Sequence, residues 1–287
     1  MASRGDIIKL LQPDDLLADD LLRIDGDDSE RDETTADDVI GLALNRKRML
    51  GKAYPFEIAD SSIRFLDANA QTFGSAYLFY LLFCSIKPDF ITPEARHFFE
   101  LESMDVVHSF FGGYAFHFGW TQLNAGRGKI HSRIQQFCDE SNLGWRPRNP
   151  HLVSSSMNDI GIDVIVWNVS NDNRGNAFVV VAQCATGHNW DQKLVSSART
   201  HLEDCLDASR DGPWINSFCT PFEIPDRIWR QSARSHDGYI FDRLRLVLES
   251  RGKGGAKCGC LASQGSKKWV KSMLRELANN RYGQAIG

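Results

Sequence analysis

The stretch Gly161-Ile-Asp-Val-Ile-Val-Trp167 predicts a buried strand with a carboxylate at its start. A turn rich in Asn and Asp follows, and Phe178-Val-Val-Val-Ala-Gln183 then predicts a second strand, so the two form a hairpin. A carboxylate among apolar neighbours is costly to bury unless a partner such as a divalent cation pairs with it. Asp163 and the amide oxygen of Gln183 therefore predict half of a divalent-metal site at one end of a sheet.

Helices and a further strand surround this hairpin in the sequence. Thr92-Pro-Glu94 has the capping hydroxyl, the early proline and the acid of a helix start, and Gly112-Gly113 is a typical helix end. The elements expected between residues 91 and 206 are a helix at 93–111, a strand at 114–120, a helix at 129–141, strands at 162–169 and 177–184, and a helix at 189–206. This order predicts an α/β core with a central mixed β-sheet flanked by helices.

Charge and hydropathy divide the chain into three regions. Residues 1–90 are acidic and mostly helical, with a buried helix expected at 72–86, and residues 1–40 hold 13 acids against 4 bases. Residues 91–206 form the predicted core. Residues 207–287 are basic and expected to be largely helical, and residues 226–287 hold 13 bases against 5 acids. A basic region of this kind suits a polyanion such as DNA or RNA, and an uncommitted solvated face is the alternative.

Bulk composition indicates a globular protein that stays in the cytoplasm. The chain has 287 residues, of which 42% are hydrophobic and 24% charged. Its seven cysteines are odd in number and scattered, which favours a reducing compartment over a disulfide framework. The most apolar run, at 75–86, is shorter than the ~20 residues that cross a bilayer, and no signal peptide is evident, so no contact with a membrane is expected.

The spacing of these residues resembles the PD-(D/E)xK nuclease superfamily, and within it the Mrr-like restriction endonuclease branch. The resemblance rests on Gly161-Ile-Asp163, on Gln183 in place of the third-motif acid, and on Phe99-Glu100 in the helix before the first core strand. It covers about residues 92–206. It implies a restriction-endonuclease-like core and a metal site formed by Asp163, Glu100 and Gln183.

One position departs from the superfamily pattern. Ala185 stands where these nucleases have lysine, and alanine cannot polarise a phosphate. Because some superfamily members have this lysine on the following helix, Lys193 is the expected substitute that would stabilise the transition state. The alternative is that Lys193 lies on a solvated helix face, as lysines usually do.

The resemblance implies a Mg²⁺- or Mn²⁺-dependent deoxyribonuclease that hydrolyses DNA phosphodiester bonds, with Asp163, Gln183, Lys193 and Glu100 as catalytic residues. It also implies a role in bacterial restriction or anti-phage defence and a partner protein such as an ATPase or helicase, with homo-oligomers as a further option. The alternative function is a catalytically inactive nuclease-fold subunit that binds DNA or assembles a defence complex.

Basic residues near the C-terminal end are expected to contact the backbone of a nucleic acid. They are Lys253, Lys257, Lys267, Lys268 and Lys271. Other candidates are weaker: Cys258-Gly-Cys260 lacks the spacing of a zinc site, and His188 and Asp159 are expected to make only local contacts.

Overall fold

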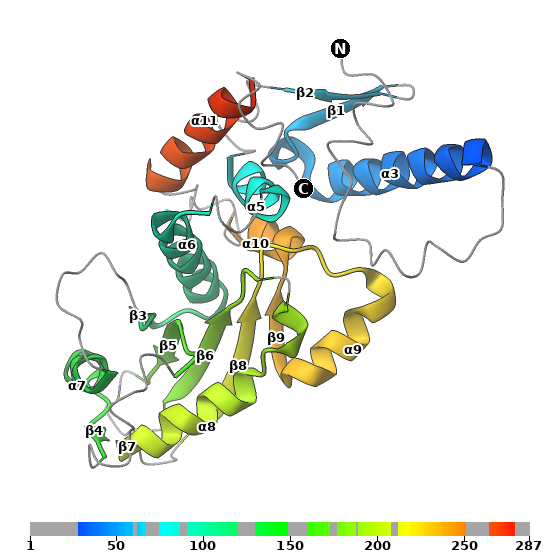
Figure 1. Ribbon diagram of the computed structural model, residues 1–287. Helices are drawn as coiled ribbons and strands as arrows, with labels where there is room; N and C mark the ends of the chain where they lie inside the picture. Colours follow the sequence, from blue (N-terminus) through cyan, green and yellow to red (C-terminus); the bar gives the residue numbers. More distant parts are fainter. Residues whose placement is uncertain are drawn as a thin grey trace. The chain divides into compact units, whose positions relative to one another are not determined.

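Two compact units make up the chain in the computed structural model: residues 1–90 with 267–287 form the first, and residues 91–266 form the second (Figure 1). The structure describes residues 28–59, 62–66, 75–86, 91–119, 130–148, 160–170, 172, 177–187, 189–207, 212–250 and 264–278. Within the described residues, no helix is long and apolar enough to cross a membrane.

The first unit is built around aromatic side chains. Its helices are α3 (Asp28–Leu50), the short 3₁₀ turn η1 (Gly51–Ala53), and α5 (Ser75–Ser85). Most side chains of α5 are buried, which confirms the buried helix expected at 72–86. From α11 (Gln264–Ala278), Trp269 packs edge-on against Phe79 of α5, with ring centroids 5.5 Å apart. Aromatic packing of this kind supplies much of the buried area of a small core.

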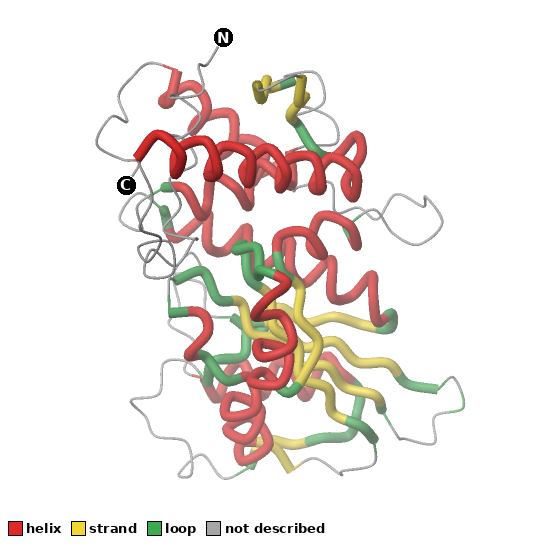
Figure 2. Tube along the Cα trace, turned by 90° about the vertical axis from the view of Figure 1, so that its right-hand side faces the viewer, coloured by secondary structure: helices red, strands yellow, loops and turns green. Residues whose placement is uncertain are grey.

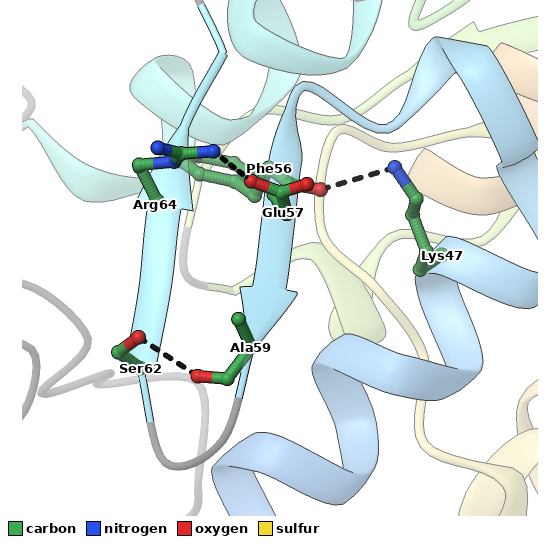
Figure 3. Close-up of polar contacts among 6 residues, drawn as sticks. All are labelled: Lys47, Phe56, Glu57, Ala59, Ser62 and Arg64. Atoms are coloured by element: carbon green, nitrogen blue, oxygen red, sulfur yellow. Dashed lines mark hydrogen bonds and ion pairs between the residues drawn. The ribbon is translucent and has the colours of Figure 1, made fainter.

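A two-stranded hairpin completes the described part of this unit (Figure 3). Strand β1 (Phe56–Ala59) pairs antiparallel with β2 (Ser62–Phe65), and Glu57 lies opposite Arg64, with which it forms an ion pair. The Lys47 ammonium of α3 donates to the Phe56 carbonyl at 3.4 Å. Cross-strand charge pairs stabilise a hairpin only modestly, by ~0.2–1 kcal/mol.

A five-stranded mixed sheet is the centre of the second unit (Figure 2), and it confirms the predicted α/β core. The strand order is β3-β5-β6-β8-β9. Strand β5 pairs antiparallel with both β3 and β6, whereas β8 pairs parallel with both β6 and β9. The strands are β3 (Tyr114–His117), β5 (Val164–Asn168), β6 (Phe178–Cys184), β8 (Trp214–Cys219) and β9 (Gly238–Phe241).

Different helices cover the two faces of this sheet. On one, called the α8 face, Val181 and Phe218 share a buried cluster with side chains of α7 (Ile130–Ser141) and α8 (Val195–Cys205). On the other, called the α6 face, Phe110 of α6 packs against Phe241 of β9 with ring centroids 5.4 Å apart. The remaining helices of this unit are α6 (Pro93–Phe111), α9 (Asp226–His236) and α10 (Arg243–Glu249). Residues that alternate along a strand therefore point to different helices.

The sequence signals at the ends of α6 are confirmed. Thr92 caps the helix by accepting from the Ala95 amide at 3.2 Å, and the helix ends before Gly112, whose φ is +75°. At Gly113, a side chain would come within 2.1 Å of the Trp167 carbonyl oxygen. Glycine is therefore required where the chain turns from α6 into β3.

Three expected elements differ in the structure. The sheet extends past residue 206 because β8 and β9 join it, so the region after 206 is not only helical. Helix α8 begins at Val195 and not near 189, because η4 (Trp190–Gln192) and an extended Lys193 come first. Strand β3 is shorter than expected, because Phe118 and Gly119 turn to donate to the Asp163 carbonyl. A small separate pairing joins β4 (Arg146–Pro147) to β7 (Leu206–Asp207).

Candidate functional site

Asp163 lies where three strands meet at one end of the sheet. Its carboxylate Oδ2 accepts from the backbone amide of Cys184 at 2.6 Å, which extends the β5–β6 ladder by one bond. Its carbonyl accepts from the amides of Phe118 and Gly119, at 2.7 Å and 2.8 Å. These bonds hold the carboxylate in place at the edge from which a ligand would approach.

Gln183 lies directly opposite Asp163 in the β5–β6 register, because Val164 pairs with Ala182. Directly opposed residues of antiparallel strands share a face, so the two side chains start from the same side of the sheet. The Gln183 Oε1 atom is buried and finds no hydrogen-bond partner among the described residues. A buried amide oxygen without a hydrogen-bond partner lowers the stability of the fold by about 1–3 kcal/mol. The site therefore suits a cation that the Gln183 oxygen can bind. A carboxylate and an amide oxygen are among the ligands that Mg²⁺ and Mn²⁺ prefer.

Glu100 lies on α6 and forms a cluster with two histidines. Its Oε2 lies 2.7 Å from Nε2 of His117 at the end of β3, and both side chains are largely buried. His97 is one turn earlier on α6, and its ring centroid lies 5.1 Å from that of His117. Ligand atoms of the three residues all lie within 4.8 Å of one another. We call His97, Glu100 and His117 the histidine cluster.

Burial keeps the histidines of this cluster neutral near pH 7. Burial, and then the Arg133 guanidinium, lower the pKa of His117 to about 4. Burial, and then the neighbouring His117, lower the pKa of His97. A neutral imidazole has a lone pair available for a metal or a proton.

The two carboxylates of the predicted site lie in one neighbourhood but make different contacts. Burial raises the pKa of the Cys184 thiol well above its usual range. A side-chain hydrogen bond with Cys219 and the nearby charges of Asp163 and Glu100 raise this pKa further. Gly119 lies close to both residues. Its amide donates to the Asp163 backbone carbonyl, and a Cβ at Gly119 would lie 2.5 Å from Glu100 Oε2. The ligand atoms of Glu100 also lie within 4.8 Å of those of His97 and His117.

Lys193 lies near packed side chains of the α8 face, the face from which Asp163 and Gln183 also start by strand alternation. It follows η4, where Trp190 packs near Phe218 and the His236 ring stacks on Phe218 at 3.8 Å. The Lys193 backbone lies beside the His236 side chain. Burial lowers the pKa of His236, and the Lys193 backbone raises it in part. Within the described part of the chain, the Lys193 ammonium has no hydrogen bond or ion pair. Its catalytic role stays a prediction.

Ala185 is fully buried in the cluster of the α8 face, together with Val195 and Ala198 of α8. A lysine at this position would have its stem packed under α8 and its ammonium in the core. Alanine therefore matches the packing at this position.

The basic residues expected to contact nucleic acid are described only in part. On α11, Lys268 and Lys271 are exposed and Lys267 is half-buried. The expectations for Lys253, Lys257, the cysteines 258 and 260, His188 and Asp159 concern positions outside the described residues.

Two groups of functional candidates were not expected from the sequence. His97 and His117 belong to the first, although His97 precedes Glu100 by three positions and so shares its helix stripe. The second is an exposed arginine row on α9, formed by Arg227, Arg230 and Arg234. Their spacing of three and four residues was the signal that could have identified them.

Comparison with known proteins finds no relative of this chain. It matches no protein-family model, no curated protein and no solved structure.

Proposed function

We propose that this chain is a metal-dependent endonuclease that hydrolyses DNA phosphodiester bonds, with a restriction-endonuclease-like core of the PD-(D/E)xK type. The observation that carries the proposal is the pairing of Asp163 with Gln183, whose buried amide oxygen has no partner among the described residues. A carboxylate and an uncommitted amide oxygen at the same strand end are the donors a hard divalent cation prefers.

The position of this pair in the fold supports the proposal. Strands β6, β8 and β9 are parallel, and their carboxyl ends lie at the edge where Gln183 and Cys184 end β6. In open α/β sheets, ligands bind outside the carboxyl ends of the strands. The mixed five-stranded sheet between helices is also the core that the superfamily resemblance implies.

Each residue of the pair has a defined task. Asp163 supplies the negative charge, and its backbone bonds to Phe118 and Gly119 restrain its position. Gln183 supplies a neutral oxygen and thus limits the negative charge that faces the DNA phosphate. A bound Mg²⁺ or Mn²⁺ ion supplies activation of a water and neutralisation of the phosphate charge. Lys193 is the proposed cation for the transition state.

Contact with DNA falls, in this proposal, to exposed cations. The arginine row of α9 presents Arg227, Arg230 and Arg234 along one side of a helix, and Lys268 and Lys271 are exposed on α11. Lysine and arginine contacts to phosphates give affinity without sequence preference. A cytoplasmic role in bacterial restriction or anti-phage defence, alongside an ATPase or helicase, belongs to the same proposal.

A second function is favoured by one observation. Ala185 is buried at the position where the nucleases of this superfamily have lysine. A catalytically inactive subunit that binds DNA through the same fold accounts for this feature. The two functions differ in whether DNA is cut, so one assay separates them.

The deciding experiment is cleavage of supercoiled plasmid by the full chain after chelator treatment, with and without Mg²⁺ or Mn²⁺. Asp163→Asn keeps an oxygen that accepts from Cys184 but removes the charge, so it should abolish cleavage without unfolding the chain. Asp139→Asn, an exposed position on α7, is the control and should cut normally. Metal-independent DNA binding without cleavage would establish the inactive subunit instead.

A further inference from the structure

The histidine cluster brings three donor atoms together from two separate elements. Glu100 and His97 come from successive turns of α6, and His117 comes from the end of β3. His117 pairs with Val164 across the ladder, so it points to the α6 face, where the helix lies. The sequence distance between His97 and His117 is bridged by the tight turn at Gly112 and Gly113. The packing of α6 against β3 therefore brings these side chains together, although they are not all close in the sequence.

One ring nitrogen of the cluster's histidines is buried and has no hydrogen-bond partner. The Nδ1 atom of His97 is inaccessible to solvent and finds no partner among the described residues. Buried polar nitrogens are nearly always bonded, to protein, water or an ion. An unpartnered imidazole nitrogen beside a carboxylate and a second imidazole indicates a ligand.

The separation of the two rings is one that a single metal ion can bridge. A metal–nitrogen bond of ~2.0–2.1 Å, and ~1.1 Å more to the ring centre, put each centroid about 3.2 Å from a tetrahedral ion and the two centroids about 5.2 Å apart. The observed centroids of His97 and His117 are 5.1 Å apart. A bound ion would replace the 2.7 Å contact between His117 and Glu100 with one bond to each.

The backbone beside the cluster is shaped to leave room for the carboxylate. A side chain at Gly119 would come within 2.5 Å of Glu100 Oε2 and 3.1 Å of His117 Nε2. Gly119 is itself fixed by its bond to the Asp163 carbonyl at 2.8 Å. Glycine here keeps the space that the two ligand atoms occupy.

We propose that His97, Glu100 and His117 bind a divalent transition-metal ion, of which Zn²⁺ is the first candidate, as a site separate from the Asp163–Gln183 pair. Two imidazoles and one carboxylate select Zn²⁺ and its neighbours over Mg²⁺, which prefers an all-oxygen shell. Three protein ligands leave a fourth position open, as in catalytic zinc sites. The site does not depend on the proposed nuclease activity, and it assigns Glu100 to the histidines.

The test is a titration of the metal-stripped full chain with Zn²⁺ and with Mg²⁺, in competition with a chromophoric chelator. Wild type should bind one Zn²⁺ at this site and discriminate strongly against Mg²⁺. His97→Ala and His117→Ala should each weaken that binding by more than ~100-fold, beyond the effect of losing a supporting contact. His201→Ala, an exposed histidine on α8, should bind as wild type does. Equal Zn²⁺ affinity in wild type and both cluster variants would overturn the proposal.

Two further measurements separate this site from thiol binding and from the nuclease proposal. Bound Co²⁺ should give a spectrum without a thiolate charge-transfer band, and a strong band that persists in both histidine variants would assign the metal to cysteines and overturn the proposal. Asp163→Asn should still bind Zn²⁺, since Asp163 is not a ligand of this site. Loss of Zn²⁺ binding in a folded Asp163→Asn chain would overturn the independence of the two sites.

Discussion

Gly119→Ala tests the histidine cluster without removing any of its ligands. The new Cβ would lie 2.5 Å from Glu100 Oε2, and such contacts do not occur below 3.0 Å, so the carboxylate oxygen must move by about 0.5 Å or more. The second contact, 3.1 Å to His117 Nε2, is also tight and opposes a shift towards the imidazole. The substitution should therefore displace the carboxylate from the position in which it meets His117.

The size of the effect follows from this displacement. Metal–ligand distances tolerate only about ±0.2 Å, so the shift is more than twice what the site accepts. Zn²⁺ affinity should fall by at least ~10-fold, the lower end of what a disturbed supporting contact costs. The colliding atom is the end of a flexible side chain, so the free energy of unfolding should fall by no more than about 2 kcal/mol.

The assay pairs Zn²⁺ titration with chemical denaturation of the metal-free chain. Gly41→Ala is the matched control, because a Cβ on this helical glycine of α3 meets nothing within 4 Å. It should keep full Zn²⁺ affinity and stabilise the chain by ~0.5–1 kcal/mol. Unchanged Zn²⁺ affinity in Gly119→Ala would refute the assignment of the Glu100 carboxylate to the metal.

Three other outcomes are expected. Burial lowers the pKa of His236 in the folded chain, so on acidification the unfolded chain binds this proton first. The free energy of unfolding is therefore unaffected by His236 above about pH 6.5 and falls below it by up to ~1.4 kcal/mol per pH unit. His236→Phe, which keeps the stacking on Phe218, should make denaturation midpoints less pH-dependent between pH 7.5 and 5.5, and an unchanged slope would contradict this. Ala185→Lys should lower the free energy of unfolding by at least about 3 kcal/mol and leave cleavage no faster, since it buries an ammonium; a stable, faster enzyme would contradict the packing account. Replacing Arg227, Arg230 and Arg234 with Gln should make the salt dependence of DNA binding shallower by up to ~2.7 in log–log slope, and an identical slope would exclude α9 from the interface.

The hairpin and the first core helix were predictable because their signals are local. The apolar runs of β5 and β6 and the Thr92 cap of α6 act over a few residues, and the structure confirms each. The opposition of Asp163 and Gln183 was also predictable, because hairpin register and side-chain alternation determine it.

Strands β8 and β9 were missed for a physical reason. Strand β8 carries Asn216 and Ser217, which are polar yet buried, so its sequence lacks the apolar run of an interior strand. Its stability comes partly from a tertiary bond, since the Asn216 amide donates to the Asp237 carbonyl at 3.1 Å. Strand β9 is short, and a side chain at Gly238 would lie 2.2 Å from the Asn216 carbonyl oxygen, so its pairing depends on a close approach that no local pattern encodes.

The histidine cluster was missed because it depends on how α6 packs on β3. Glu100 lies on α6 and is largely buried. The contact with His117 arises only after the turn at Gly113 brings β3 back along the helix. The family resemblance placed Glu100 with Asp163, and this stays a prediction, whereas the contact of Glu100 with His117 follows from tertiary packing.

Plasmid cleavage by the chelator-treated full chain, compared with Asp163→Asn at equal concentration, tests the proposed function most directly. With Mg²⁺ or Mn²⁺ restored, the wild-type chain should nick or linearise the plasmid, and the folded variant should leave it supercoiled. Cleavage that needs no metal, cleavage by Asp163→Asn at the wild-type rate, or intact plasmid under every metal condition would contradict a metal-dependent nuclease at the Asp163–Gln183 pair.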